Sequence, residues 1–341
     1  NSKQNKIITN TRTIEENINT KIRLPTNILD KINLSHIKDK KGNADLAKQK
    51  QLKDLCSKHT QAFSHHDYDL GELNTGFQAY IQTNAPLPSP EKRRTYPKEK
   101  AQKAAEILQH MENAGVIEPS MSSYASCLHV VKKADGNVRI TIDSRKINAI
   151  THHIQSAQYN SEQILSQFAN KKYRSIFDLT ASFHQIKLHP DSKFLTSFWH
   201  PTETTKTYQY RRLPQGFRNS SVSMINAMHT AFGDLPFIYM YIDDIVIASS
   251  TYKQHLEHLE IFFKRLVEVN LKINPSKANL CAPSIKFLGF DITGDRVTIP
   301  KAKAHAISQI EPPKNRKQTM QVIGNLNYYR KFIPHYAKVM Q

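Results

Sequence analysis

Cysteine is scarce in this chain of 341 residues. Cys56, Cys127 and Cys281 are widely separated and lack the paired spacing of a zinc ribbon or a disulfide framework, which favours a reducing compartment. No stretch approaches the roughly 18 uncharged apolar residues of a transmembrane helix, and the polar amino terminus lacks the apolar block of a secretory signal. We therefore expect a cytoplasmic protein without a membrane partner.

Acidic residues are also few relative to basic ones. The chain has 29 Asp and Glu against 48 Lys and Arg, a formal net charge of +19 and a sequence pI near 9.7. The basic excess is spread along the chain, which suits a long channel that neutralises many phosphates better than a single basic arm. The composition therefore predicts a polyanionic partner and favours nucleic acid over a membrane surface.

Helical and strand-like segments alternate without an internal repeat, which predicts a mixed α+β fold. Four prolines predict that residues 84–98 form an extended connector. An Asp-Gly pair within the turn at 134–137 predicts a hairpin over 127–142. Helical patterns cover 46–63, 97–116 and 221–232 and recur in an apolar stripe of Leu256, Leu259, Phe262, Phe263, Leu266 and Val267. Residues 175–179 and 237–249 have the composition of strands but contain aspartates where core residues belong.

These embedded aspartates are the main chemical signal. Asp243 and Asp244 are flanked by apolar residues, a pattern that predicts two short strands meeting at a turn with both carboxylates at its tip. Two like charges this close repel strongly unless a cation neutralises them, and hard oxygen ligands suit Mg²⁺. Asp178 also interrupts an apolar strand and is the best candidate for a third carboxylate. The alternative is a charged turn on a solvent-exposed hairpin, and each aspartate alone is weak evidence.

Five short motifs occur in an order that resembles reverse transcriptases. They are Phe-Asp-Leu at 177–179, Phe-His-Gln-Ile at 183–186, Leu-Pro-Gln-Gly-Phe at 213–217, Tyr-Ile-Asp-Asp at 241–244 and Phe-Leu-Gly-Phe at 287–290. The resemblance is to the polymerase of gypsy-type long-terminal-repeat retrotransposons, within a retrovirus-like pol polyprotein. Leu-Pro-Gln-Gly-Phe is similar to the retroviral enzymes as well.

The resemblance implies a right-hand polymerase fold with fingers, palm and a partial thumb, in which helices cover a mixed or antiparallel palm sheet. Residues 1–45 are rich in Asn and Lys without a sustained period, which predicts a partly ordered leader, and 46–98 are expected to form a linker helix and an extended connector. The resemblance implies fingers (99–155 and 186–219), palm (156–185 and 220–296, the second part with the primer grip) and thumb (297–341). The chain carries no Asp-Thr/Ser-Gly protease triplet and no paired His and Cys ligands of an integrase. We expect a polymerase region without ribonuclease H that belongs to a longer parent.

The same resemblance implies the metal site. Asp178, Asp243 and Asp244 would hold two Mg²⁺ ions, for which Mn²⁺ could substitute. Lys277 occupies the position of a lysine that would protonate pyrophosphate as general acid, although a surface lysine after a helix is the ordinary alternative. The His-rich and Asp-rich residues 65–69 lack a companion cluster, so we expect a solvated turn there.

Residues that bind the incoming nucleotide are implied in the fingers and the palm. Lys133, with Lys132 as the alternative, and Arg139 would reach the triphosphate from the hairpin tip. Phe183 would block a ribose 2′-hydroxyl, and the alternative is a core aromatic. Gln215 would help to position the nucleotide and the template base.

The primer is expected to contact the last motif and the thumb. Phe287, Leu288, Gly289 and Phe290 would form the primer grip, which holds the 3′ end in line for attack, and a buried strand is the alternative or a compatible role. Basic residues of the tail alternate with Tyr328, Tyr329 and Phe332, which suggests phosphate contacts with occasional stacking.

The function implied is an RNA-directed, and also DNA-directed, DNA polymerase that adds dNTPs to a primer 3′-hydroxyl. Its partners would be an RNA template, a DNA primer and product, the RNA–DNA hybrid and other segments of a pol polyprotein, with the oligomeric state left open. Virus-like particles in the cytoplasm and a nuclear phase go with that class of element. One alternative is a catalytically retired RNA-binding scaffold. Another is an RNA-templated RNA polymerase, against which Phe183 argues.

Overall fold

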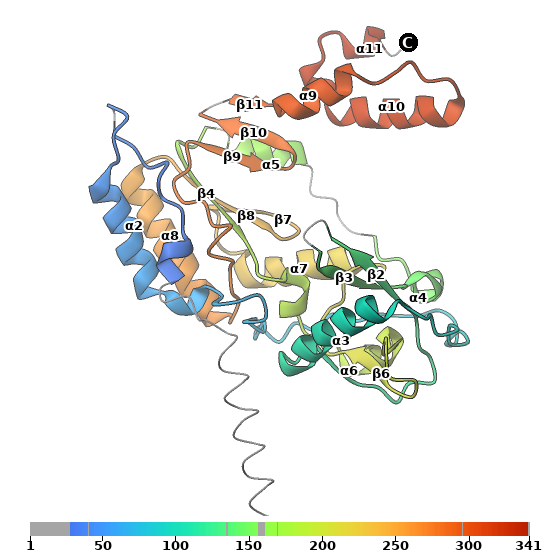
Figure 1. Ribbon diagram of the computed structural model, residues 1–341. Helices are drawn as coiled ribbons and strands as arrows, with labels where there is room; N and C mark the ends of the chain where they lie inside the picture. The colour runs from blue at the N-terminus through green and yellow to red at the C-terminus, as the bar shows by residue number, and fades with distance from the viewer. Residues whose placement is uncertain are drawn as a thin grey trace, which may run out of the picture.

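A three-stranded antiparallel sheet carries the predicted aspartates. The computed structural model describes residues 28–39, 41–133, 136–155, 161–168, 170–294 and 296–339. The sheet has the order β4 (Tyr173–Asp178), β8 (Asp244–Ser249) and β7 (Ile238–Tyr241), and β7 and β8 form a hairpin (Figure 1). The two predicted strand segments are therefore confirmed, and they pair in one sheet.

Both faces of this sheet are buried, which explains why β8 is almost continuously apolar. Ile245 and Ile247 belong to the main core, together with residues of α7 (Ser220–Phe232) and α8 (Tyr252–Glu268). Val246 and Ala248 alternate with them and belong to a second core cluster. That cluster also contains residues of α5 (Ser161–Phe168), β9 (Ser284–Phe287) and β10 (Phe290–Thr293).

The helices predicted from periodicity are present with small changes at their ends. α2 spans Leu46–Lys58 and is followed by η2 (Thr60–Ala62), and α3 spans Lys98–Asn113. Gly115, at φ +66°, follows α3 in the left-handed conformation that commonly ends a helix. The stripe on α8 is confirmed where Leu259, Phe262, Phe263 and Leu266 are fully buried, but it is wrong for Val267, which is 37% exposed.

The fingers are built around α3 and a hairpin of β2 (Leu128–Lys132) and β3 (Val138–Ile142), which α3 contacts on both strands. This confirms the predicted hairpin, although residues 134 and 135 of its turn lie outside the described residues. A second sheet has the order β1 (Ile117–Pro119), β6 (Thr207–Tyr210) and β5 (Phe198–Trp199). Short helices complete the fingers and join them to the palm: α4 (Arg145–Ile150), η3 (Ser182–Gln185), α6 (Pro190–Lys193) and η4 (Phe194–Thr196).

Residues 28–37 contribute to the main core, which the sequence pattern did not predict. After η1 (Ile28–Lys31), the chain continues through Ile32, Leu34 and Ile37, which with Ile28 are at most 6% exposed. The segment 28–37 of the expected partly ordered leader (1–45) is thus ordered against the main core, and residues 1–27 lie outside the described residues. The connector at 84–97 contains no helix or strand, as predicted.

The last part of the chain forms a small sheet and a group of helices. β9, β10 and β11 (Arg296–Thr298) lead to α9 (Lys301–Ser308), α10 (Arg316–Tyr328), η5 (Arg330–Phe332) and α11 (Tyr336–Val339). Figure 1 shows these helices beyond the palm sheet and well separated from the fingers, as expected for a thumb. Among the described residues, no helix is both long and apolar enough to span a membrane.

His255 on α8 joins this helix to the palm sheet. It is fully buried, and its ring nitrogens form hydrogen bonds with the hydroxyls of Ser175 on β4 (2.8 Å) and Ser249 on β8 (2.9 Å). Burial lowers the pKa of His255 to about 3, and the nearby His258 acts in the same direction. Between about pH 6.5 and pH 3, the imidazole is therefore neutral in the folded protein, whereas the same histidine binds a proton in the unfolded chain.

Lowering the pH from 7 to 4.5 should destabilise the fold through this histidine. The unfolded state binds the proton below about pH 6.5 and the folded state only near pH 3, so stability falls as the pH drops through that window. Urea unfolding at both pH values should show a loss on the order of 1–3 kcal/mol. His255→Gln should reduce the loss and exposed His152→Gln should not; equal losses in all three proteins would contradict the assignment.

Candidate active site

The turn between β7 and β8 presents two carboxylates. Tyr241 and Asp244 are the last cross-strand pair, which leaves Ile242 and Asp243 as the two turn residues. This confirms the predicted position of the Asp pair at the tip of a hairpin. Ile242 has φ +57°, a left-handed conformation that costs a β-branched residue on the order of 1–2 kcal/mol. Such strain persists only where the surrounding structure holds it, and it occurs preferentially at functional sites.

Asp178, the last residue of β4, is the direct cross-strand partner of Asp244. Because side chains alternate along a strand, these two carboxylates point to the same face of the sheet as Ile176 and Val246. The second core cluster covers that face with residues of β9, β10 and the thumb. The aspartates therefore meet at one end of the sheet, on the side where the β9–β10 hairpin lies.

Lys277 lies against these carboxylates although 98 residues separate it from Asp178 in the chain. Its Nζ atom is 2.8 Å from Oδ2 of Asp178, and this hydrogen bond raises the pKa of Lys277. Burial raises the pKa of Asp244 to about 6, and the charges of Asp243 and Asp178 add to that rise. Ser182 donates a long hydrogen bond of 3.4 Å to Oδ2 of Asp243. The cluster thus carries unbalanced negative charge that attracts cations.

The donor chemistry of this cluster fits a divalent metal ion. Carboxylate oxygens are preferred ligands of Mg²⁺, and a cation would relieve the repulsion that raises the pKa of Asp244. In the part of the chain that the structure describes, no three His, Cys, Asp or Glu side chains are arranged to hold one ion as they stand. Binding would therefore require these side chains to draw together and Lys277 to release Oδ2 of Asp178.

A cavity of about 460 Å³ lies beside the aspartates and is lined by Ala181. The next residue, Ser182, contacts Asp243, which places the cavity next to the carboxylates. Two predicted cations of the fingertip, Lys133 and Arg139, line it together with Gln215. The other lining residues are Asp67, Tyr68, Leu70, Ile107, Met111, Val138, Ile140, Thr141, Ile142, His184 and Tyr210. The structure thus brings three of the four predicted nucleotide-binding residues to one site, with Lys133 rather than Lys132 in its wall.

Phe183 is the predicted residue that the structure does not place in this wall. Its side chain is 8% exposed and belongs to the main core. Among the described residues that line the cavity, its neighbours Ala181 and His184 are present and Phe183 is not. The core role that the sequence left open is confirmed, and a contact with ribose stays a prediction.

The loop at residues 65–69 has a role that sequence reasoning missed. Asp67 and Tyr68 line the cavity, Tyr68 stacks on His110 with ring centroids 5.3 Å apart, and Asp69 forms an ion pair with Lys272. The expected solvated turn is present, since residues 65–67 are exposed, but Asp67 and Tyr68 also line the cavity, a role that the sequence did not predict. No motif signalled this, since its partners lie tens to hundreds of residues away.

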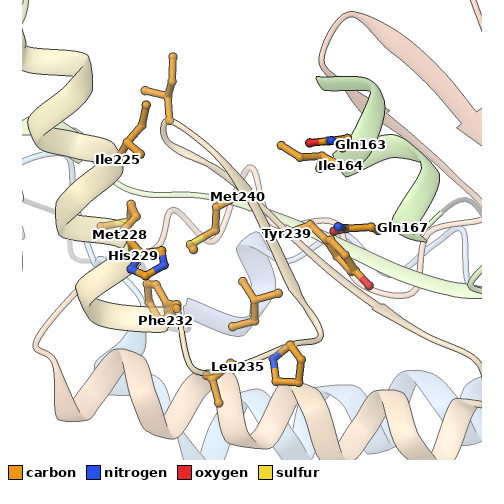
Figure 2. A pocket seen from close by; sticks show the side chains of 14 residues that line it. Gln163, Ile164, Gln167, Ile225, Met228, His229, Phe232, Leu235, Tyr239 and Met240 are labelled. Carbon is orange, nitrogen blue, oxygen red and sulfur yellow. The ribbon is translucent and has the colours of Figure 1, made fainter. Parts of the chain in front are cut away.

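A second cavity, of about 360 Å³, runs along β7 behind the turn between β7 and β8. Figure 2 shows that α7 supplies one wall and α5 the other, with the strand between them. The labelled side chains include Ile225, Met228 and His229 from α7, Gln163, Ile164 and Gln167 from α5, and Tyr239 and Met240 from β7. Ile242 also borders this space, so the strained turn has unfilled volume on one side.

The predicted primer grip is the turn between β9 and β10. Phe287 and Phe290 end and begin the two strands and are 1% and 5% exposed, so both have the buried role that the sequence allowed. Leu288 and Gly289 form the turn, at φ +54° and +72°. This places the turn backbone, rather than the phenylalanine rings, at the surface.

The comparisons with known proteins agree with this arrangement. Residues 131–292 match the family model "Reverse transcriptase (RNA-dependent DNA polymerase)", a region that contains Asp178, Asp243, Asp244 and Lys277. The Pro-Pol polyprotein of Simian foamy virus type 1 is 31% identical over 263 residues, which are 76% of this chain and 22% of that protein. The chain belongs to the reverse transcriptase family. It is retrovirus-like, as expected from the motifs.

Other relatives and a solved structure support this reverse transcriptase assignment. The Pol polyprotein of the Drosophila melanogaster transposon 297 is 33% identical over 68% of this chain and 22% of its own length. That of the transposon gypsy is 29% identical over 85% of this chain and 28% of its own length. A foamy viral protease-reverse transcriptase, solved in complex with double-stranded DNA, superposes with a TM-score of 0.77 at 25% identity over 92% of this chain and 53% of that one. The chain thus spans about a quarter of these curated relatives and has the expected right-hand polymerase fold.

Proposed function

We propose that this reverse transcriptase domain extends a DNA primer on an RNA or DNA template, using dNTPs. The observation that carries the proposal is the meeting of Asp178, Asp243 and Asp244 beside a cavity lined by Lys133 and Arg139. Carboxylates next to a cationic pocket of nucleotide size match the needs of phosphoryl transfer, which are positioning and charge stabilisation. The family description and the nucleic-acid complexes of the similar foamy viral enzymes support the substrate class.

The residues of the chain have separable roles in this proposal. Asp178 and Asp243, with Asp244 beside them, would hold two Mg²⁺ ions, which would activate the primer 3′-hydroxyl and stabilise the pyrophosphate. Lys133 and Arg139 neutralise the triphosphate, because negative charge accumulates there as the bond to pyrophosphate breaks. Gln215 lines the same cavity and orients the nucleotide there. Lys277 reaches the same carboxylates and is available as an acid for the leaving group.

Extension of a labelled DNA primer on an RNA template, with Mg²⁺ and dNTPs, tests the proposal. Wild-type protein should produce full-length DNA, and omission of Mg²⁺ should abolish the product. A folded protein that binds the hybrid but never extends it would instead support a retired RNA-binding scaffold. The ion pair between Lys277 and Asp178 gives that alternative a structural basis, because it neutralises one of the metal-binding carboxylates.

Lys133 and Lys132 provide a matched test of the nucleotide cavity. They are adjacent, and only Lys133 lines the cavity. Lys133→Ala should raise the KM for dNTPs about tenfold, which corresponds to ~1.4 kcal/mol for the loss of one charge-assisted contact. Lys132→Ala should change it less than twofold in the same steady-state assay. Equal effects of the two changes would remove the cavity from the nucleotide site.

Phe183 tests sugar selection. Because its ring is buried, Phe183→Ala would leave a core cavity and cost about 3–5 kcal/mol, so Phe183→Leu is the better variant. If the ring also excludes the 2′-hydroxyl, Phe183→Leu should raise kcat/KM for ribonucleotides about tenfold and leave that for dNTPs within about twofold. Single-nucleotide incorporation of dGTP and GTP measures both. Unchanged discrimination would leave Phe183 with its core role alone, and ribonucleotide preference in wild-type protein would favour the RNA polymerase alternative.

A further inference from the structure

The thumb makes a specific contact with the turn between β9 and β10. The hydroxyl of Tyr328, the last residue of α10, donates a hydrogen bond of 2.6 Å to the backbone carbonyl of Leu288. Leu288 has φ +54°, which a leucine adopts at a cost on the order of 1–2 kcal/mol, so its conformation needs external support. The bond from Tyr328 supplies such support to the carbonyl oxygen.

Aromatic contacts hold Tyr328 in place for this bond. Its ring stacks on Phe290 at a centroid distance of 5.4 Å and 13° between planes, and it meets Tyr329 edge-on at 5.0 Å. Tyr329 and Phe332 also pack on Phe290, at 5.7 and 5.4 Å. Phe290 is therefore the ring against which all three thumb aromatics pack.

This contact lies next to the catalytic turn. Tyr241, which closes the β7–β8 hairpin, packs against the same core cluster as Leu288, and the two rings that Tyr328 contacts, Phe290 and Tyr329, belong to that cluster. Burial raises the pKa of Tyr328, and Tyr329 and Tyr241 add to that rise. Thumb, primer-grip turn and catalytic hairpin thus meet around one side chain. In the described residues α9 and α10 bury no side chain of their own, so the position of α10 depends on contacts at its end.

We infer that Tyr328 is a positioning residue that couples the thumb to the primer grip, and through it to the primer 3′ end. This inference rests on the proposed function. The hydroxyl fixes the carbonyl of Leu288, so the turn is held in its strained form when the thumb is docked. Movement of the thumb away from the palm breaks the bond and releases the turn. The turn is therefore held for primer binding only when the thumb is docked on the palm.

Tyr328→Phe isolates the hydroxyl because it keeps the ring and its stacking. Tyr80→Phe is the matched control, since Tyr80 is also 49% exposed and packs edge-on against His189, remote from the thumb in the chain. In single-turnover extension, Tyr328→Phe should slow nucleotide addition at saturating dNTP about fivefold, the loss expected for one hydrogen bond. Products made in the presence of a heparin trap should be shorter, while the KM for dNTPs and the thermal midpoint should stay unchanged. A merely structural role would not produce that split.

Hydrogen exchange makes the inference testable even without activity. Amides in residues 284–293 of the free protein should exchange faster in Tyr328→Phe than in wild type or Tyr80→Phe. If wild-type protein extends no primer, the proposed function fails while the exchange comparison still decides whether Tyr328 holds the turn. Wild-type exchange and wild-type extension in Tyr328→Phe, or equal slowing in Tyr80→Phe, would overturn the inference.

Discussion

Asp243→Asn should lower the rate of primer extension by about 10³-fold or more, with binding of the RNA–DNA hybrid nearly intact. The amide has almost the same shape as the carboxylate but carries no charge, so the change removes a proposed metal ligand from the hairpin tip without altering the packing. Asp178→Asn should have a similar effect, because Asp178 is paired with Asp244 across the sheet. Gel-based extension at saturating hybrid and dNTP measures the rate, and fluorescence anisotropy measures binding.

The same variant separates catalysis from stability. Asp243 helps to raise the pKa of Asp244, which means that the two carboxylates repel each other in the folded protein. Removing that charge should leave the thermal midpoint unchanged or higher in metal-free buffer. Asp54→Asn, on the exposed face of α2, is the control and should leave the rate unchanged. Loss of hybrid binding or a lower midpoint in Asp243→Asn would instead assign the aspartate to the fold.

The catalytic hairpin was predictable because its signals are local. An apolar run interrupted by two aspartates dictates both the strands and the turn. The same logic placed Asp178 in a strand, and the structure shows that it is the last residue of that strand. The helices α3 and α8 followed from their periodic apolar residues, most of which are buried as predicted; Ala105, Ile107 and Leu256 are half-buried and Val267 is exposed. In each case, the residues that decide the structure lie within about one turn or one strand of each other.

The rest of the site depends on contacts between distant segments. Nothing in the sequence around Tyr68 indicates that it lines the same cavity as Arg139. The core role of residues 28–37 requires the presence of α2 and its neighbours. The strain at Ile242 was equally hidden, since a β-branched residue is expected to avoid the left-handed region. Tertiary packing decides these features, and a single sequence carries no record of it.

Lys277 is the residue whose role the structure changes most. The sequence left a general acid and an ordinary surface lysine as alternatives, and the structure places its ammonium group on the carboxylate of Asp178, a proposed metal ligand. The side chain is 61% exposed, so it is free to leave Asp178 when a metal ion or a nucleotide arrives. Two roles are then distinct: a proton donor to pyrophosphate, or a cation that neutralises the site only until metal binds.

Lys277→Met and Lys277→Arg should distinguish these roles, with a loss of about 10²-fold in both variants if the lysine donates a proton. Arginine keeps the positive charge but cannot be deprotonated in a protein, so it cannot replace a proton donor. If Lys277 only neutralises the carboxylates, Lys277→Arg should have the wild-type rate. Lys277→Met should then reach its half-maximal rate at a lower Mg²⁺ concentration, because no ammonium group competes for Asp178. Single-turnover rates across a Mg²⁺ titration measure both quantities, with exposed Lys253→Met as the control. A wild-type rate and a wild-type Mg²⁺ requirement in Lys277→Met would exclude both roles, and the ion pair would then be a surface contact of the kind that contributes little.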